Sequence, residues 1–182
     1  YTLKNNTEKN QLVELYLLIR PYQVNPYYQF LNLAGGVGSI SKLAASDSRN
    51  RVDVDNSSLY LTQKFESFSA IPFYTANPAE MILSKRESEM SATDGFGLCS
   101  GIVKYSVNLK PRQSHTIFAI VPYHFNKIEE SELFIKNIID TIAKVSESWR
   151  EKTEHVKFNL PSSAHDLIKT YRSNLMYILI NR

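Results

Sequence analysis

Residues 101–124, GIVKYSVNLKPRQSHTIFAIVPYH, decide the fold that the sequence predicts. Polar and apolar residues alternate over 102–109, which places one apolar set on a single face of a β-strand. Residues 110–113 contain a proline and predict a turn. Residues 114–121 are rich in β-branched and aromatic side chains, and 117–121 are apolar on both faces. We therefore expect two paired strands at the centre of a β-sandwich, the second covered on both sides.

Further short strands are predicted before this stretch. Apolar runs bounded by turn residues predict strands at 1–3, 11–20, 39–45, 51–55, 59–63 and 65–74. Residues 21–26 are extended because each of two prolines disfavours helix in the residue before it. We interpret 35–38 as a glycine turn, since no Lys-Ser or Lys-Thr pair follows as a phosphate loop requires, and 91–97 as a polar loop. Asn77 predicts the cap of a helix over 79–86.

The hydrophobic period changes to that of a helix after residue 126. An apolar stripe from Phe134 to Trp149 predicts a helix over residues 130–153. Ser162 or Ser163 is expected to cap a second helix, whose apolar stripe is too extensive for a helix that packs on nothing.

The fold class that follows is mainly β, a large antiparallel β-sandwich followed by two C-terminal helices. We place the sandwich domain at residues 1–126 and a linker helix with the start of a helical region at 127–182. The chain opens without methionine and stops inside the second predicted helix, so we expect a piece of a longer polypeptide. No run of about 20 apolar residues occurs, which predicts a soluble segment without a transmembrane helix.

Composition excludes several kinds of partner and site. The formal charge of +3, from 21 basic and 18 acidic residues, is too small to predict binding to nucleic acid or to a membrane surface. Cys99 is the single cysteine, so an intrachain disulfide and a cysteine zinc cluster are excluded, and we expect a small core residue. The four histidines lack metal-ligand spacing. We therefore expect no metal and no cofactor.

No catalytic constellation is recognisable. Glycoside hydrolysis needs two carboxylates that flank the scissile bond. The scattered acids, each interpreted as a solvated surface group, are Glu66, Glu80, Glu87, Glu89 and Asp94. We assign no catalytic residue.

Aromatic residues are abundant, with eleven tyrosines and nine phenylalanines, and exposed rings can stack on sugars. Our candidates for contact with a carbohydrate or a neighbouring domain are Tyr22, Tyr27, Tyr28, Phe30 and Trp149. Trp149 lies on the helical stripe, which favours packing over sugar stacking.

The order of the predicted elements resembles the N-terminal β-supersandwich, linker helix and first barrel helix of glucoamylase-like and debranching-type glycoside hydrolases. The segments that carry this resemblance are 17–26, 39–40, 52–55, 105–111, 120–122, 149–150 and 158–161. The resemblance implies a non-catalytic accessory domain that packs against a C-terminal (α/α)6 catalytic domain of the same polypeptide and helps to shape its site. It also implies that the catalytic carboxylates lie beyond Arg182, so that this segment alone is inactive.

Two other functions fit the same residues. The chain could be a carbohydrate-binding module whose exposed rings contact a glycan directly. It could instead be a purely structural or assembly domain that binds no ligand.

Overall fold

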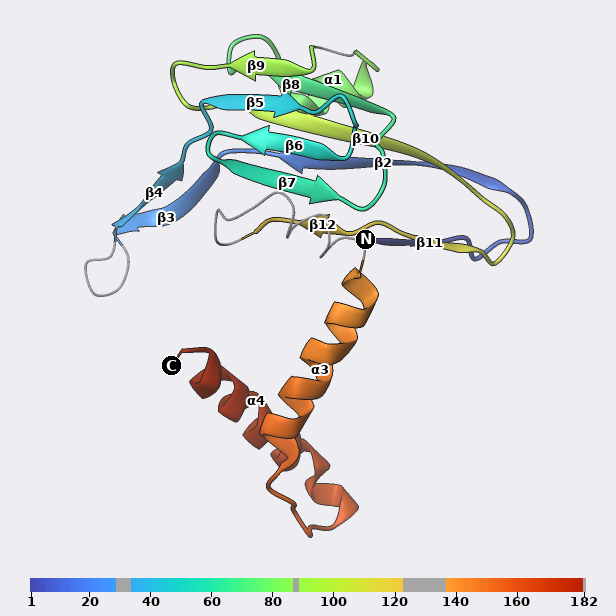
Figure 1. The fold of residues 1–182 in the computed structure, drawn as a ribbon, viewed down its shortest axis with the longest axis vertical. Helices are drawn as coiled ribbons and strands as arrows, with labels where there is room; N and C mark the ends of the chain where they lie inside the picture. Colours follow the sequence, from blue (N-terminus) through green and yellow to red (C-terminus); the bar gives the residue numbers. More distant parts are fainter. Residues whose placement is uncertain (29–33, 87–88, 123–136, 182) are drawn as a thin grey trace. The chain divides into compact units, whose positions relative to one another are not determined.

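The computed structural model describes residues 1–28, 34–86, 89–122 and 137–181, with side chains for all of these except 23–28 and 34–37. The chain divides into two compact units, Tyr1–Ile135 and Lys136–Arg182. The first is built mainly of antiparallel strands and the second contains two helices, as predicted (Figure 1). The domain boundary predicted at residue 126 lies outside the described residues.

The strands of the first unit form sheets of different sizes. In chain order the described strands are β1 (Thr2–Lys4), β2 (Gln11–Ile19), β3 (Tyr22–Tyr28), β4 (Ala34–Gly38), β5 (Lys42–Ala45), β6 (Arg51–Val54), β7 (Ser57–Leu61), β8 (Ser67–Ile71), β9 (Ser91–Thr93), β10 (Ser100–Leu109), β11 (Ser114–Thr116) and β12 (Ala119–Ile120). The two larger sheets have the orders β12-β7-β6-β5-β9 and β2-β10-β8, and two-stranded pairs are β1-β11 and β3-β4. All these strand pairs are antiparallel.

One hydrophobic core joins the two larger sheets. Leu43 and Val52 come from the five-stranded sheet, and Phe68 and Val103 come from the three-stranded sheet. Cys99 is fully buried in the same cluster, which confirms its predicted core position. One face of each sheet lines this core, and the three-stranded sheet also buries Ile71 and Ile102, which pack with Met81 in a second hydrophobic cluster.

The predicted central hairpin is wrong in its pairing. β10 pairs with β2 and β8, whereas the segment after the turn forms two short strands, β11 paired with β1 and β12 paired with β7. The break falls at Ile117 and Phe118, whose N–H groups donate to Tyr1 O and Thr62 Oγ1. Ile117 is fully buried, but Val121 is 65% exposed, so the run is not covered throughout. An apolar run reports burial and carries no information about its partner strand.

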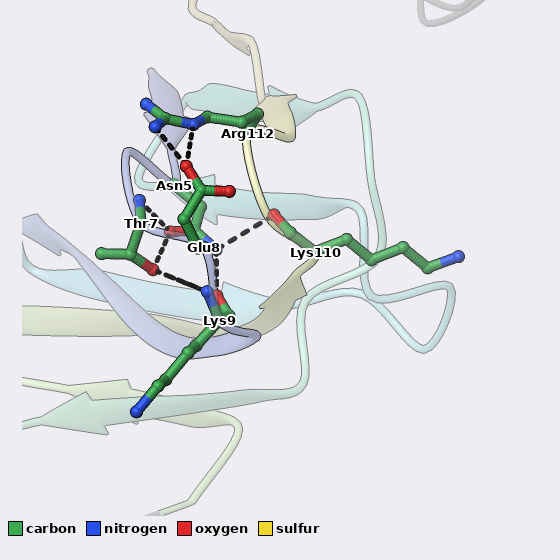
Figure 2. Close-up of polar contacts among 6 residues, drawn as sticks. All are labelled: Asn5, Thr7, Glu8, Lys9, Lys110 and Arg112. Carbon is green, nitrogen blue, oxygen red and sulfur yellow. Dashed lines mark hydrogen bonds and ion pairs between the residues drawn. The ribbon is translucent and has the colours of Figure 1, made fainter.

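Gln11 of β2 pairs with Leu109 of β10, and beyond this pair the chain turns back into the β1-β11 pair (Figure 1). Asn5 lies at this corner and is 4% exposed. Its amide Nδ2 donates to the carbonyl oxygens of Lys9, Leu109 and Lys110 at 2.7, 3.1 and 3.0 Å. On the exposed side Arg112 Nε donates to Glu8 Oε1 at 2.9 Å (Figure 2). A single buried amide therefore satisfies backbone acceptors from both arms of the bend.

Two segments predicted as a turn and a loop contain strands, and one predicted helix cap is present. The expected glycine turn at 35–38 is wrong, because Ala34–Gly38 forms β4 and pairs with β3. The polar loop at 91–97 begins as a strand, because β9 finds a partner in β5. The helix cap is confirmed: α1 (Pro78–Leu83) begins after Asn77, whose Oδ1 accepts from Ala79 N at 2.8 Å.

The helical unit contains α3 (Ile138–Glu154), the 3-10 turn Ser162–Ala164 and α4 (His165–Ile180). The predicted start of the first helix at residue 130 lies outside the described residues. The expected serine cap is wrong, because the 3-10 turn shifts the N-cap of α4 to Ala164, which makes no side-chain cap bond. Arg172 pairs with Glu154 at 3.2 Å and so joins α4 to the end of α3.

Among the described residues, no helix combines the length and the apolar character that crossing a membrane requires.

Candidate functional site

Strand pairing brings together two acids that lie far apart in the sequence. Glu14 in β2 and Glu66, next to β8, each contact the ammonium of Lys104 in β10, at 3.1 and 3.2 Å. The hydrogen bond from Lys104 lowers the pKa of Glu14, and hydrogen bonds from Ser106 and then Lys104 lower the pKa of Glu66. Both carboxylates are therefore held in the ionised form, whereas a glycosidase acid needs a raised pKa to carry its proton. The cluster is a charge network and supplies no general acid.

Asp94 is not the solvated surface group that we expected, because it is only 2% exposed. Its carboxylate accepts from the backbone N–H of Phe73 at 2.5 Å and from that of Phe96 at 2.8 Å. Its own N–H donates to Ser41 O at 2.8 Å. The carboxylate can be buried because backbone N–H groups from two loops take the place of water as its hydrogen-bond donors. One of these loops is distant in the sequence.

The two loops held by Asp94 carry exposed aromatic rings. Phe73, Tyr74 and Phe96 are 60%, 72% and 72% exposed, and we call them the aromatic platform. The rings of Tyr74 and Phe96 meet edge to face, with centroids 6.1 Å apart. Aromatic rings are common in interfaces, and neighbouring exposed rings form an apolar patch of the kind that can mark a recognition surface.

A pocket of about 270 Å³ adjoins the platform. It lies where β2 and β8 end and β10 begins, and its lining includes Arg20, Ile71, Phe73, Asn77, Leu98 and Ser100. Its lining combines apolar side chains with the polar side chains of Arg20, Asn77 and Ser100, and a small-molecule site needs both kinds of group. A second, wider depression of about 530 Å³ beside β5 and β9 has no aromatic ring in its lining.

The residues predicted from the sequence do not gather into one described site. Tyr22 is exposed in β3, one residue after Pro21 of the pocket lining. Tyr27 and Tyr28 belong to β3, but their side chains are not among those described, and Phe30 lies outside the described residues. Trp149 lies half-buried on α3, with the ammonium of Lys152 at 5.3 Å from its ring centroid.

Sequence reasoning missed the aromatic platform. Phe73 and Tyr74 were assigned to a strand, and Phe96 to a polar loop. One local signal was present: the rings follow Pro72 and the Asp94-Gly95 pair, which are turn residues and predict exposed positions.

The described part of the chain contains no group of three or more His, Cys, Asp or Glu side chains placed to hold a metal ion. No protein-family model matches the chain, and no curated protein matches its sequence.

Proposed function

We propose that this chain is a non-catalytic accessory domain of a larger carbohydrate-active enzyme, with a supersandwich-type β-unit that packs against a helical (α/α)6 catalytic domain of the same polypeptide. The order of elements supports this proposal. A mainly β unit is followed by a long helix, an extended segment and a second helix, which is the order in the glycoside hydrolases that the sequence resembles.

The observation that carries the proposal is the apolar surface of α4. No residue of this helix is buried, and four apolar side chains are between 65% and 69% exposed: Leu167, Tyr177, Ile178 and Ile180. An apolar helix surface of this extent favours a packing partner over permanent contact with water. A neighbouring helical domain offers a matching surface, since helices pack through their apolar stripes.

The charge network supports the non-catalytic part of the proposal. Glu14 and Glu66 both sit against Lys104 with lowered pKa values, so neither is suited to protonate a leaving group. The accessory role therefore fits these two acids better than a hydrolytic role does.

Two measurements on the purified chain test the proposal. Incubation with soluble α- and β-glucans should release no reducing ends, and release that disappears in Glu14→Gln would contradict a non-catalytic role. Sedimentation velocity should show self-association that weakens in Ile178→Lys. The matched control is Asn174→Lys, an exposed polar position on the same helix. A wild-type chain that stays monomeric at high concentration would argue that α4 needs no partner.

A second candidate function, direct carbohydrate binding, is favoured by one observation, the exposed aromatic platform beside a pocket.

A further inference from the structure

We propose that the pocket between the ends of β2 and β8, together with the aromatic platform, is a saccharide-binding site. In this site one pyranose ring occupies the pocket against Phe73, and the next ring lies on Tyr74 and Phe96. The inference rests on the proposed function in carbohydrate metabolism and gives the accessory domain a ligand of its own.

The platform is built to stay in place without a ligand. One buried carboxylate, Asp94, accepts from the backbone N–H of both Phe73 and Phe96, so the two loops are tied to a single point. The loop after Asp94 closes with a bond from Gly97 N to Asp94 O at 3.0 Å. Rings on anchored loops lose little conformational freedom when they bind, which makes pre-organised aromatic side chains effective contacts.

The combination of groups fits a sugar. A pyranose has C–H faces that pack on aromatic rings and a rim of hydroxyl groups that need hydrogen-bond partners. Ile71 and Leu98 give the pocket apolar walls, and Phe73 links it to the platform. A protein partner would be matched better by a broad apolar surface, whereas this site joins a few rings to a small pocket with polar groups.

Two polar side chains of the pocket, Asn77 and Arg20, have hydrogen-bond donors that no other described residue uses. The Oδ1 of Asn77 is used by the first N–H groups of α1, which leaves its Nδ2 as a donor. No hydrogen bond or ion pair joins the Arg20 guanidinium to the part of the chain that the structure describes. Its planar fork can donate to two neighbouring oxygens of one ring.

The volume of the pocket and the charge of its lining indicate which sugars it can bind. The volume of about 270 Å³ is slightly below the range of drug-sized sites, which begins at about 300 Å³, so the pocket suits a single ring rather than a chain. Among the described residues, the lining contains Arg20 and no carboxylate. A uronic acid ring should therefore bind more tightly than its neutral counterpart.

Isothermal titration calorimetry on the whole chain tests the inference, with cellohexaose, maltohexaose and hexagalacturonate as probes. We expect saturable binding of at least one probe. Tyr74→Ala and Phe96→Ala should each weaken it about three- to tenfold, as the loss of one ring contact predicts. Arg20→Gln should weaken binding of hexagalacturonate more than binding of a neutral probe.

The matched control is Tyr177→Ala, which removes an equally exposed tyrosine from α4. All these side chains are exposed, so thermal melts should confirm that each variant is folded. Binding that survives both platform variants, or that is lost in Tyr177→Ala instead, would overturn the site. A folded wild-type chain that binds none of the three probes would also overturn it. The proposed accessory role would be contradicted by different results, namely glycan hydrolysis by the chain or a wild-type chain that stays monomeric. Failure of the saccharide site and failure of the accessory role can therefore be told apart.

Discussion

The carboxylate of Asp94 accepts the backbone N–H of Phe73, 21 residues earlier in the chain, at 2.5 Å. The same carboxylate accepts from Phe96 N two residues later, so one buried side chain joins a distant loop to its own turn. A buried acid is stable only when its oxygens are hydrogen-bonded, and here the bonds also place the rings of the aromatic platform.

Replacing Asp94 with asparagine should destabilise the β-unit. The amide offers one acceptor oxygen, and its NH2 group would face one of the two backbone N–H donors that the carboxylate now satisfies. One buried donor is then left without a partner, which lowers the free energy of unfolding by about 1–3 kcal/mol. Urea unfolding measures this loss. The control is Asp47→Asn at an exposed turn position, which should stay within about 0.5 kcal/mol of the wild type.

Gly97→Ala should be destabilising, whereas Gly95→Ala should not. Gly97 has φ of +69°, and a Cβ built there lies 2.8 Å from Ser39 Cβ. The left-handed conformation costs a non-glycine residue about 1–2 kcal/mol before any steric overlap is added. Gly95 has no atom within 4 Å of an added Cβ. Equal midpoints for the two variants in a denaturant titration would show that the turn adjusts at no cost.

Asn5→Asp tests the corner between β1 and β2. A carboxylate cannot donate to Lys9 O, Leu109 O and Lys110 O and would place its charge among these three acceptors. Figure 2 shows the bonds to Lys9 and Lys110. The expected loss is on the order of 3 kcal/mol at neutral pH. It should shrink in acid, where the protonated side chain can donate again. Asn6→Asp, at the exposed neighbouring position, should have little effect, and similar losses for the two variants would contradict this role of Asn5.

The buried phenol of Tyr105 should make the protein less stable at alkaline pH. Burial raises the pKa of Tyr105 to about 12, above its value of about 10 in the unfolded chain. The folded state therefore holds the phenol proton more tightly than the unfolded chain does. The stability that this difference contributes is fully present below about pH 10 and is lost as pH rises through about 12.

The measurement is the difference in free energy of unfolding between the wild type and Tyr105→Phe. The variant also loses the hydrogen bond from the Tyr105 hydroxyl to Gln63 O, which lowers its free energy of unfolding by a constant amount at lower pH. Between pH 10 and 12 the wild type should lose stability faster than Tyr105→Phe. Tyr22→Phe at an exposed position should follow the wild type, and parallel curves for wild type and Tyr105→Phe would rule out this linkage.

The sequence by itself determined those strands, helices and helix caps that depend on neighbouring residues in the chain. The alternating and apolar runs predicted β2 and β10, and helical periodicity predicted α3 and α4, because the spacing of apolar residues depends on the geometry of the element itself. Asn77 predicted the start of α1 because a side chain can cap a helix only a few residues away.

Only the tertiary structure decided which strands pair and which polar groups are buried. β10 takes β2 and β8 as neighbours instead of the segment that follows its turn, since every strand offers the same backbone donors and acceptors and packing of the whole unit selects among them. Asp94 is buried because a donor from Phe73, 21 residues away, meets it there. Glu14 and Glu66 meet at Lys104 for the same reason, because contacts across a sheet depend on its register.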